Sequence, residues 1–339
     1  ATKLGILYSA RQDAGYETPI ASGTVVSSGA VIEAEITIPP TTREIFERAS
    51  TKGGFYEIPP VSGSPYGASF TVSMPLHGIS SVAPTDNVTE HPDAMVLDAL
   101  LGSSSRSNYK TNGLESSPAS TKQLFEVDSA DIDAGVYTAG DALMVNNKGA
   151  FIQSIDAAAD TLTPVLELSL APVANATVYG SNTVYLSTAA TKSFTFVWRS
   201  RETATQLVMQ SCVPTSATIT LGPKDSYPKV EVTFQTNKVA SETASGALPD
   251  FDYAFPVLPV PTSDNGGRMV FATVSGAVGA TEVDVEGLSI SITQDLVPQL
   301  SHNSISGVAD VLVVNRAVEV SFKGVLGAVN PYNSTGALI

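Results

Sequence analysis

The chain has 339 residues, of which 43% are hydrophobic and only 15% are charged. This length is enough for two ordinary domains or one domain with a large insertion, and the high apolar and low charged fractions argue against an intrinsically disordered chain. Eighteen Lys and Arg against 33 Asp and Glu give a net charge of −15, which argues against tight binding of nucleic acid, because phosphates require clustered cationic side chains.

Alternating apolar and polar residues predict β-strands along much of the chain. In chain order, the candidates are the opening stretch ATKLGILYSARQDAG, VIEAEITI from Val31, SFTVSMPL from Ser69, SFTFVWRS from Ser193, SATITL from Ser216, VEVTFQTNK from Val230, LSISI from Leu288 and RAVEVSFKG from Arg316. Turn-forming Gly, Pro, Asn and Asp separate them. Each candidate strand has one polar and one apolar face, which predicts a mainly β fold in which an antiparallel sheet is packed on a single side.

Between the second and third candidate strands lies a polar, glycine-rich segment from Thr41 to Tyr66. It is too long for a simple hairpin turn, and loops of this length are usually functional. We therefore expect it to make a contact of its own, with a loose surface loop as the alternative.

One segment, EHPDAMVLDALLG from Glu90, has a helical pattern. Pro92 suits a first helical turn, Asp93 complements the positive helix end, and Gly102 suits the position just past the last turn. The apolar residues at helical spacing are Val96, Leu97, Leu100 and Leu101. We predict a helix of about ten residues whose apolar stripe covers one face of the sheet.

Between Glu126 and Ser187 the pattern changes to several short strands joined by Gly and Asn turns, which predicts a small β module. Eight acidic residues against Lys148 alone give this segment a net charge of −7, nearly half that of the whole chain. The predicted organisation is therefore a main β domain in two parts, 1–125 and 188–339, interrupted by an acidic insert at 126–187.

Residues that could support catalysis or metal binding do not form a recognisable motif. His77, His91 and His302 lie far apart and have no Cys or His at metal-ligand spacing. Nucleophile elbows and phosphate-binding loops are missing from the sequence. Glu33 and Glu35 share one strand face, which suits either a pair of glycosidase carboxylates or a solvated surface. We expect no cofactor, no metal and no enzymatic activity.

The one cysteine, Cys212, excludes an intramolecular disulfide framework and favours folding in a reducing cytoplasm. Burial habits predict that it fills space in the core. The apolar run at the start is too short for a signal peptide, and no stretch approaches the about 18 apolar residues of a spanning helix. We expect a soluble protein without membrane contacts.

Four stretches, in this order, resemble the bacteriophage tail tube (major tail) protein family. EITIPPTTREIFERASTKGGFYEIPPVSGSPYGASFTVSMPLHG is similar to the family's first long hairpin, and HPDAMVLDALLGSS to the helix after it. QLVMQSCVPTSATITLGPKDSYPKVEVTFQTNK resembles the middle sheet, where a short strand and a Cys or Gly step lead into a hairpin. LSISITQDLVPQLSHNSISGVADVLVVNRAVEVSFKG is similar to the closing strand pair. Together they cover 128 of the 339 residues, and the 126–187 insert departs from the family pattern.

The resemblance implies a tail-tube β-sandwich or barrel, and hexameric rings stacked into a tube through which double-stranded DNA passes without specific binding. It also implies tape measure, tail terminator and distal tail proteins as partners, and a virion tail assembled in the host cytoplasm. Strand edges that pair across subunits and head-to-tail stacking would produce such a filament. The insert is expected on the outside of the tube.

In this setting the polar strand faces are expected to line the bore and keep DNA from adhering. The lumen-facing carboxylates are then Glu33, Glu35, Glu231 and Glu319. Lys229 and Lys323 fall on the same faces and oppose a uniformly acidic wall. The field of each charge weakens within about 8 to 10 Å, so only residues of the wall would matter to the passing duplex.

By the same resemblance, the long loop is expected to reach the adjacent ring. Its candidate stacking residues are Thr41, Arg43, Lys52, Phe55, Tyr56 and Tyr66. Two other classes of function are open: a secreted or fibre-type β-protein whose insert binds carbohydrate, and a β-sandwich hydrolase with paired carboxylates. Glycan binding or turnover would favour one of these.

Overall fold

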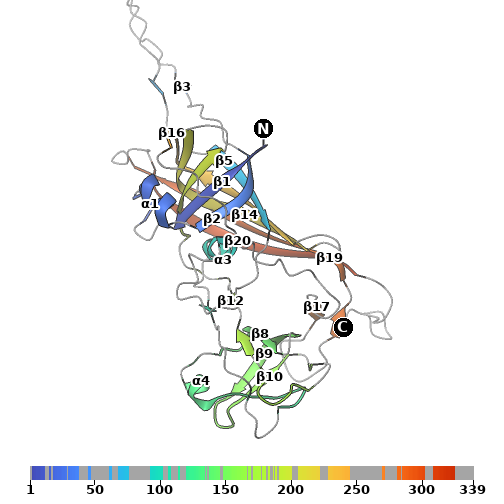
Figure 1. Ribbon diagram of the computed structural model, residues 1–339. Helices are drawn as coiled ribbons and strands as arrows, with labels where there is room; N and C mark the ends of the chain where they lie inside the picture. Colours follow the sequence, from blue (N-terminus) through green and yellow to red (C-terminus); the bar gives the residue numbers. More distant parts are fainter. Residues whose placement is uncertain are drawn as a thin grey trace, which may run out of the picture.

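A computed structural model shows a mainly antiparallel β protein with three short helices in the part of the chain it describes (Figure 1). A mainly β fold is thereby confirmed. The described residues are 2–11, 15–16, 18–28, 30–37, 45–46, 61–62, 68–75, 92–101, 106–107, 114, 120–133, 135, 137–145, 148–165, 167–168, 171–176, 178–180, 182–183, 186, 188, 191–200, 205–221, 228–244, 269–271, 281–283, 285–301 and 308–324.

The elements of the main domain are β1 (Thr2–Arg11), α1 (Ser22–Ser28), β2 (Ala30–Thr37), β3 (Ile45–Phe46), β4 (Val61–Ser62), β5 (Ala68–Pro75), α3 (Pro92–Leu101), β13 (Phe194–Ser200), β14 (Thr205–Leu221), β15 (Lys229–Thr236), β16 (Lys238–Thr243), β17 (Met269–Phe271), β18 (Thr281–Val283), β19 (Val285–Leu300) and β20 (Val308–Gly324). Between α3 and β13 come β6 (Arg106–Ser107), β7 (Phe125–Glu126), α4 (Ser129–Asp133), β8 (Ala142–Val145), β9 (Lys148–Asp156), β10 (Thr161–Pro164), β11 (Val178–Gly180) and β12 (Asn182–Thr183). Each of the eight strands predicted from alternation overlaps a strand of the main domain, and the segment from Val230 to Lys238 covers most of β15 and reaches the start of β16.

The main domain contains a nine-stranded antiparallel sheet with the order β13-β1-β2-β5-β15-β14-β19-β20, with β16 paired to β14. Because β13 also pairs with β14, six of these strands close on themselves. The strand β14 makes this possible: on one edge it pairs with β13 over its first half and with β19 over its second. The β19–β20 hairpin therefore branches from a closed ring of strands (Figure 1).

The branch coincides with irregular backbone in β14. Ser211 has a positive φ of 53°, which is uncommon for a residue with a Cβ, and the register with β15 shifts between Pro214 and Ser216. Such bulges bend a strand and increase its twist. The family resemblance implies a short strand here, followed by a step at Cys212 and a hairpin; the structure has one 17-residue strand instead.

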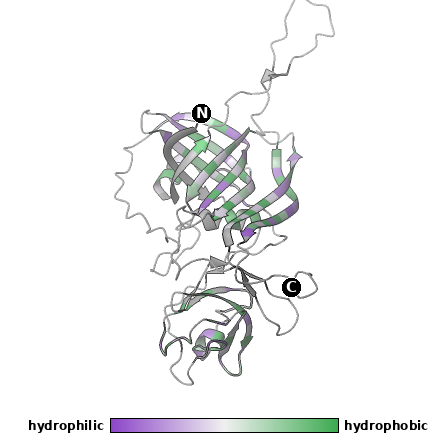
Figure 2. Cartoon of the chain, turned by 90° about the vertical axis from the view of Figure 1, so that its right-hand side faces the viewer, coloured by the Kyte–Doolittle hydropathy of each residue, from purple (hydrophilic) through white to green (hydrophobic). Residues whose placement is uncertain are grey.

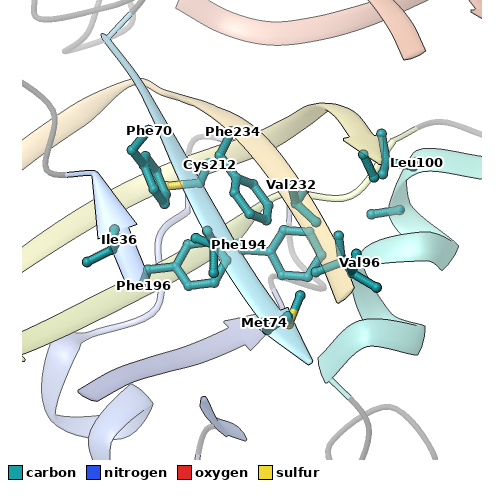
Figure 3. Packing of buried hydrophobic residues seen from close by; sticks show 14 of the residues in the cluster. Ile36, Phe70, Met74, Val96, Leu100, Phe194, Phe196, Cys212, Val232 and Phe234 are labelled. Carbon is teal, nitrogen blue, oxygen red and sulfur yellow. The ribbon is translucent and has the colours of Figure 1, made fainter. Parts of the chain in front are cut away.

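Aromatic side chains fill the interior of the ring of strands (Figure 3). The rings of Phe70 and Phe234 stack with centroids 5.3 Å apart, and Phe196 meets Phe234 edge-on at 4.8 Å. Phe194 and Cys212 are fully buried beside them. Aromatic pairs add about 0.5–1.5 kcal/mol beyond the burial of their area, so this cluster is a main source of the domain's stability.

The helix predicted from Pro92 onward is present as α3 and covers the apolar face of the sheet at β14, β19 and β2. Val96 and Leu100 are fully buried, and Leu97 and Leu101 are partly buried against the same core. Figure 3 shows Val96 and Leu100 facing the phenylalanines and Val232.

The segment between α3 and β13 includes a second, five-stranded sheet of order β11-β8-β9-β10-β7. Its core is separate from that of the main domain and includes Leu114, Phe125, Leu143, Ile152 and Leu162. We call this part the insert module. The sequence predicts that the insert begins at residue 126. The second core begins earlier in the chain, because it includes the buried side chains of Leu114 and Phe125.

Candidate functional site

A polar surface lies on one face of the large sheet, where five strands run side by side. Cross-strand pairing places Ser73 of β5, Glu231 of β15, Thr218 of β14, Ser291 of β19 and Glu319 of β20 opposite one another in turn. Directly opposed residues share a sheet face. Glu231 and Glu319, far apart in sequence, therefore belong to one row, and we call this surface the polar face.

The backbone of β2 continues this row, since position 35 is paired with Ser73. Glu35 thus joins the register of Glu231 and Glu319, and Glu33 lies two residues before it on the same strand. For Glu33 and Glu35 the structure describes the backbone only.

Hydroxyl groups make up most of the rest of the polar face. Thr71, Thr233, Ser216 and Thr293 form the next row, and the Oγ1 atoms of Thr71 and Thr233 are 3.4 Å apart. Glu231 and Glu319 are exposed. Figure 2 shows the corresponding alternation of hydrophilic and hydrophobic positions along the strands.

The charges on the polar face are mixed. Exposed Lys229 lies two residues from Glu231, and exposed Lys323 lies four from Glu319. Asp295, which is not among the predicted site residues, is exposed on β19 and accepts a hydrogen bond from Asn315 Nδ2 at 3.3 Å. The alternation of Ser289, Ser291 and Thr293 extends to Asp295, so periodicity was a signal that could have identified it.

The opposite face of the same strands is apolar, and its burial decreases toward β20. Across one row, Met74 and Val230 are 2% and 0% exposed, Ile219 and Ile290 are half-buried, and Val320 is 50% exposed. The core and α3 therefore cover the start of this face but not its end.

The last strand, β20, leaves an apolar edge uncovered. No described strand pairs with its outer edge. Its exposed large apolar side chains are Leu312, Val314, Val318, Val320 and Phe322. An unpaired strand edge is a template for pairing with another chain, and exposed apolar side chains in such a position often mark an interaction site.

Gln294 anchors this hairpin to the body of the domain. Its buried amide Nε2 donates hydrogen bonds to the carbonyl of Pro214 and to Thr191 Oγ1 at 3.3 Å, and its Oε1 accepts one from Arg316 Nε at 3.4 Å. Thr191 Oγ1 in turn donates to the carbonyl of Ala99 in α3 at 3.1 Å. Desolvation lowers the pKa of Arg316 from its ordinary value.

Several residues singled out from the sequence lie outside the described residues. They are Thr41, Arg43, Lys52, Phe55, Tyr56, Tyr66, His77, His91 and His302. Within the long loop the structure describes β3 and β4, which pair antiparallel through Ile45 with Ser62 and Phe46 with Val61. The two arms of the loop therefore run side by side at that point.

Cys212 is fully buried, and burial raises the pKa of its thiol to about 12. The thiolate is the nucleophilic form of cysteine, so this thiol is inert at neutral pH. Over the described ranges, no group of three or more His, Cys, Asp or Glu side chains could hold a metal ion. None of the helices described is long and apolar enough to cross a membrane.

No protein-family model matches the chain, and no curated protein matches it.

Proposed function

We propose that this protein is the subunit of a bacteriophage tail tube, in which stacked, hexameric rings enclose a passage for DNA. The observation that carries the proposal is a continuous sheet that is polar on one face and ends in the uncovered apolar edge of β20. A sheet that is polar on one face and unpaired at its edge strand can form one segment of a wall, which neighbouring copies extend by pairing with that edge.

The polar face supports the assignment of the bore. Glu231, Asp295 and Glu319 bring carboxylates to this face, and hydroxyl groups surround them. Like charge keeps a phosphate backbone from adhering, while hydroxyl groups offer only weak, neutral contacts. The exposed Lys229 and Lys323 make the wall weakly rather than uniformly acidic. Such a surface suits rapid passage of DNA without specific binding.

The insert module fits a position outside the tube. Its core is formed by its own side chains, so the main domain does not depend on it for burial of apolar surface. In the proposed assembly, the long loop containing β3 and β4 contacts the next ring. Tape measure, terminator and distal tail proteins are the partners, and the tube is assembled in the host cytoplasm as part of the virion tail.

Electron microscopy of the concentrated, purified chain tests the assembly, and hollow filaments with a regular axial repeat are expected. The lumen is tested with virions that carry Glu231→Lys and Glu319→Lys together. Tubes should remain intact, but time-resolved DNA release should be slower because phosphates then meet cations. Asp133→Lys with Glu167→Lys, both exposed on the insert module, makes the same charge change as a control. Equal release from both variants would contradict a lumen at the polar face.

A further inference from the structure

The free edge of β20 has a sequence that can pair with itself. From Asn315 to Lys323 its register on β19 is regular, without a bulge, and this segment contains no proline. Such a stretch lacks two of the devices by which natural proteins keep edge strands from pairing. Along it, Val318, Val320 and Phe322 alternate with Glu319, Ser321 and Lys323, and all six are exposed.

We propose that a second copy of this chain occupies this edge, with the two β20 strands antiparallel about a two-fold axis at Ser321. The proposal deepens the proposed function, on which its regulatory meaning rests. A two-fold axis perpendicular to the sheet keeps each face of the sheet continuous across the two copies. Because side chains alternate between the faces, an odd-numbered residue can then oppose only odd-numbered residues, and an even-numbered residue only even-numbered ones. The permitted registers are therefore those centred on a residue.

Charge selects among these registers. A centre at Ser321 places Glu319 directly opposite Lys323 of the second copy. It also places Val320 opposite the second copy's Phe322. A centre at Glu319 would instead oppose two carboxylates, and one at Arg316 two guanidinium groups. Opposite-charge and aromatic–β-branched pairs each stabilise an antiparallel pair by about 0.2–1 kcal/mol, whereas directly opposed like charges destabilise it.

The distribution of exposed apolar side chains also points to a second copy. Of the large apolar residues exposed in the described part of the chain, only Phe151, Val173 and Leu186 lie outside the β19–β20 hairpin. The same strand of another copy therefore offers the apolar face of β20 a complementary apolar surface. Such pairing would occupy the edge that a neighbouring subunit needs in a ring. The paired form is thus a resting dimer that delays assembly.

A cysteine at the axis tests this arrangement. Directly opposed residues of an antiparallel pair have Cα atoms about 4.5–5.5 Å apart, within the range of a disulfide. Ser321→Cys should give a disulfide dimer with oxidised glutathione about tenfold faster than Ala317→Cys, because pairing raises the effective concentration of the two thiols. Position 317 is an exposed control on the same face, and native Cys212 is buried. Equal rates, or faster cross-linking at position 317, would overturn the proposal.

Sedimentation velocity supplies a second readout. Val320→Lys should convert dimer to monomer at the same concentration, while Val314→Lys, also exposed on β20 but outside the overlap, should remain dimeric. Circular dichroism and Trp198 fluorescence confirm that both variants are folded. A monomeric unmodified chain would overturn the dimer.

The oxidised Ser321→Cys dimer then separates this inference from the proposed function. It should form no tubes until a reductant is added, whereas the unmodified chain assembles throughout. If the chain forms tubes but is never dimeric in solution, the resting dimer is contradicted and the proposed tube function is not. If Ser321→Cys forms the disulfide dimer but neither its reduced form nor the unmodified chain makes tubes, self-pairing is supported and the proposed tube function is contradicted. Tubes from the locked dimer would overturn the regulatory role.

Discussion

Gln294 holds the β19–β20 hairpin, whose outer edge is proposed to pair with a neighbouring subunit, against the rest of the main domain. It is 5% exposed and connects β19 to the bulged part of β14, to Thr191 and to Arg316. A buried amide with this many partners fixes one arrangement of the hairpin, because any other would leave polar atoms unpaired.

Gln294→Ala should therefore lower the free energy of unfolding by about 1–3 kcal/mol, since it leaves the Pro214 carbonyl without its side-chain donor. Gln299→Ala, at an exposed position of the same strand, should change stability little. Urea unfolding followed by circular dichroism measures both. Indistinguishable midpoints for the two variants would show that the hydrogen bonds of Gln294 do not stabilise the native state.

Cys212 gives the main domain a defined alkaline sensitivity. Burial raises the pKa of its thiol from an ordinary 9.0 to about 12 in the folded protein. Below pH 9 the thiol is protonated whether or not the chain is folded, so the full stability is present there. As the pH rises from 9 toward 12, only the unfolded chain readily loses the proton, and stability is lost.

We expect the unfolding free energy of the unmodified chain to fall by up to about 1.4 kcal/mol per pH unit more than that of Cys212→Ala within this window. Urea midpoints at several pH values measure the difference. In the native protein at pH 8, iodoacetamide should leave Cys212 unmodified, and rapid alkylation under native conditions would contradict its burial.

At the scale of elements, the two hydrophobic cores are formed by different side chains. The aromatic core of the main domain and the core of the insert module have no residue in common. Units with separate cores can unfold separately.

Phe234→Ala should accordingly destabilise the main domain by about 3–5 kcal/mol and Leu162→Ala the insert module by about 2–5 kcal/mol, because each leaves a cavity in a fully buried site. Scanning calorimetry should show two transitions, of which each variant lowers one. A single transition lowered equally by both substitutions would mean that the parts unfold as one unit.

Periodicity predicted the strands and their faces well, and β15 shows why. Val230, Val232 and Phe234 are fully buried while Glu231 is exposed, because a side-chain period of two is a local property that tertiary contacts rarely change. The length of β14 was not predicted from the sequence. Its Cys212–Pro214 segment resembles a break, yet pairing on both edges keeps it in one strand.

For the whole molecule, the proposed tube requires contacts along two directions, within a ring and between rings. The edge of β20 is proposed to serve the first. The loop from Thr41 to Tyr66, whose arms pair at β3 and β4, is proposed to serve the second, since a contact that does not close on itself generates a filament.

Removing residues 50–57, between β3 and β4, should therefore yield single rings or soluble subunits in place of tubes. Negative-stain microscopy measures the outcome. Deleting 114–186, which removes the complete core of the insert module, should leave tubes intact but thinner in outline. Normal tubes from the first deletion, or none from the second, would contradict these assignments.

By itself, the sequence determined the approximate positions of the main strands, which residues of each strand share a face, and where α3 lies. These properties follow from the spacing of neighbouring residues. Only the tertiary structure decided that Glu35, Glu231 and Glu319 share one cross-strand register, that β13 closes the ring of strands on β14, and that β20 is left as the uncovered edge. Pairing between strands far apart in the chain depends on the packing of the whole core, which local alternation does not encode.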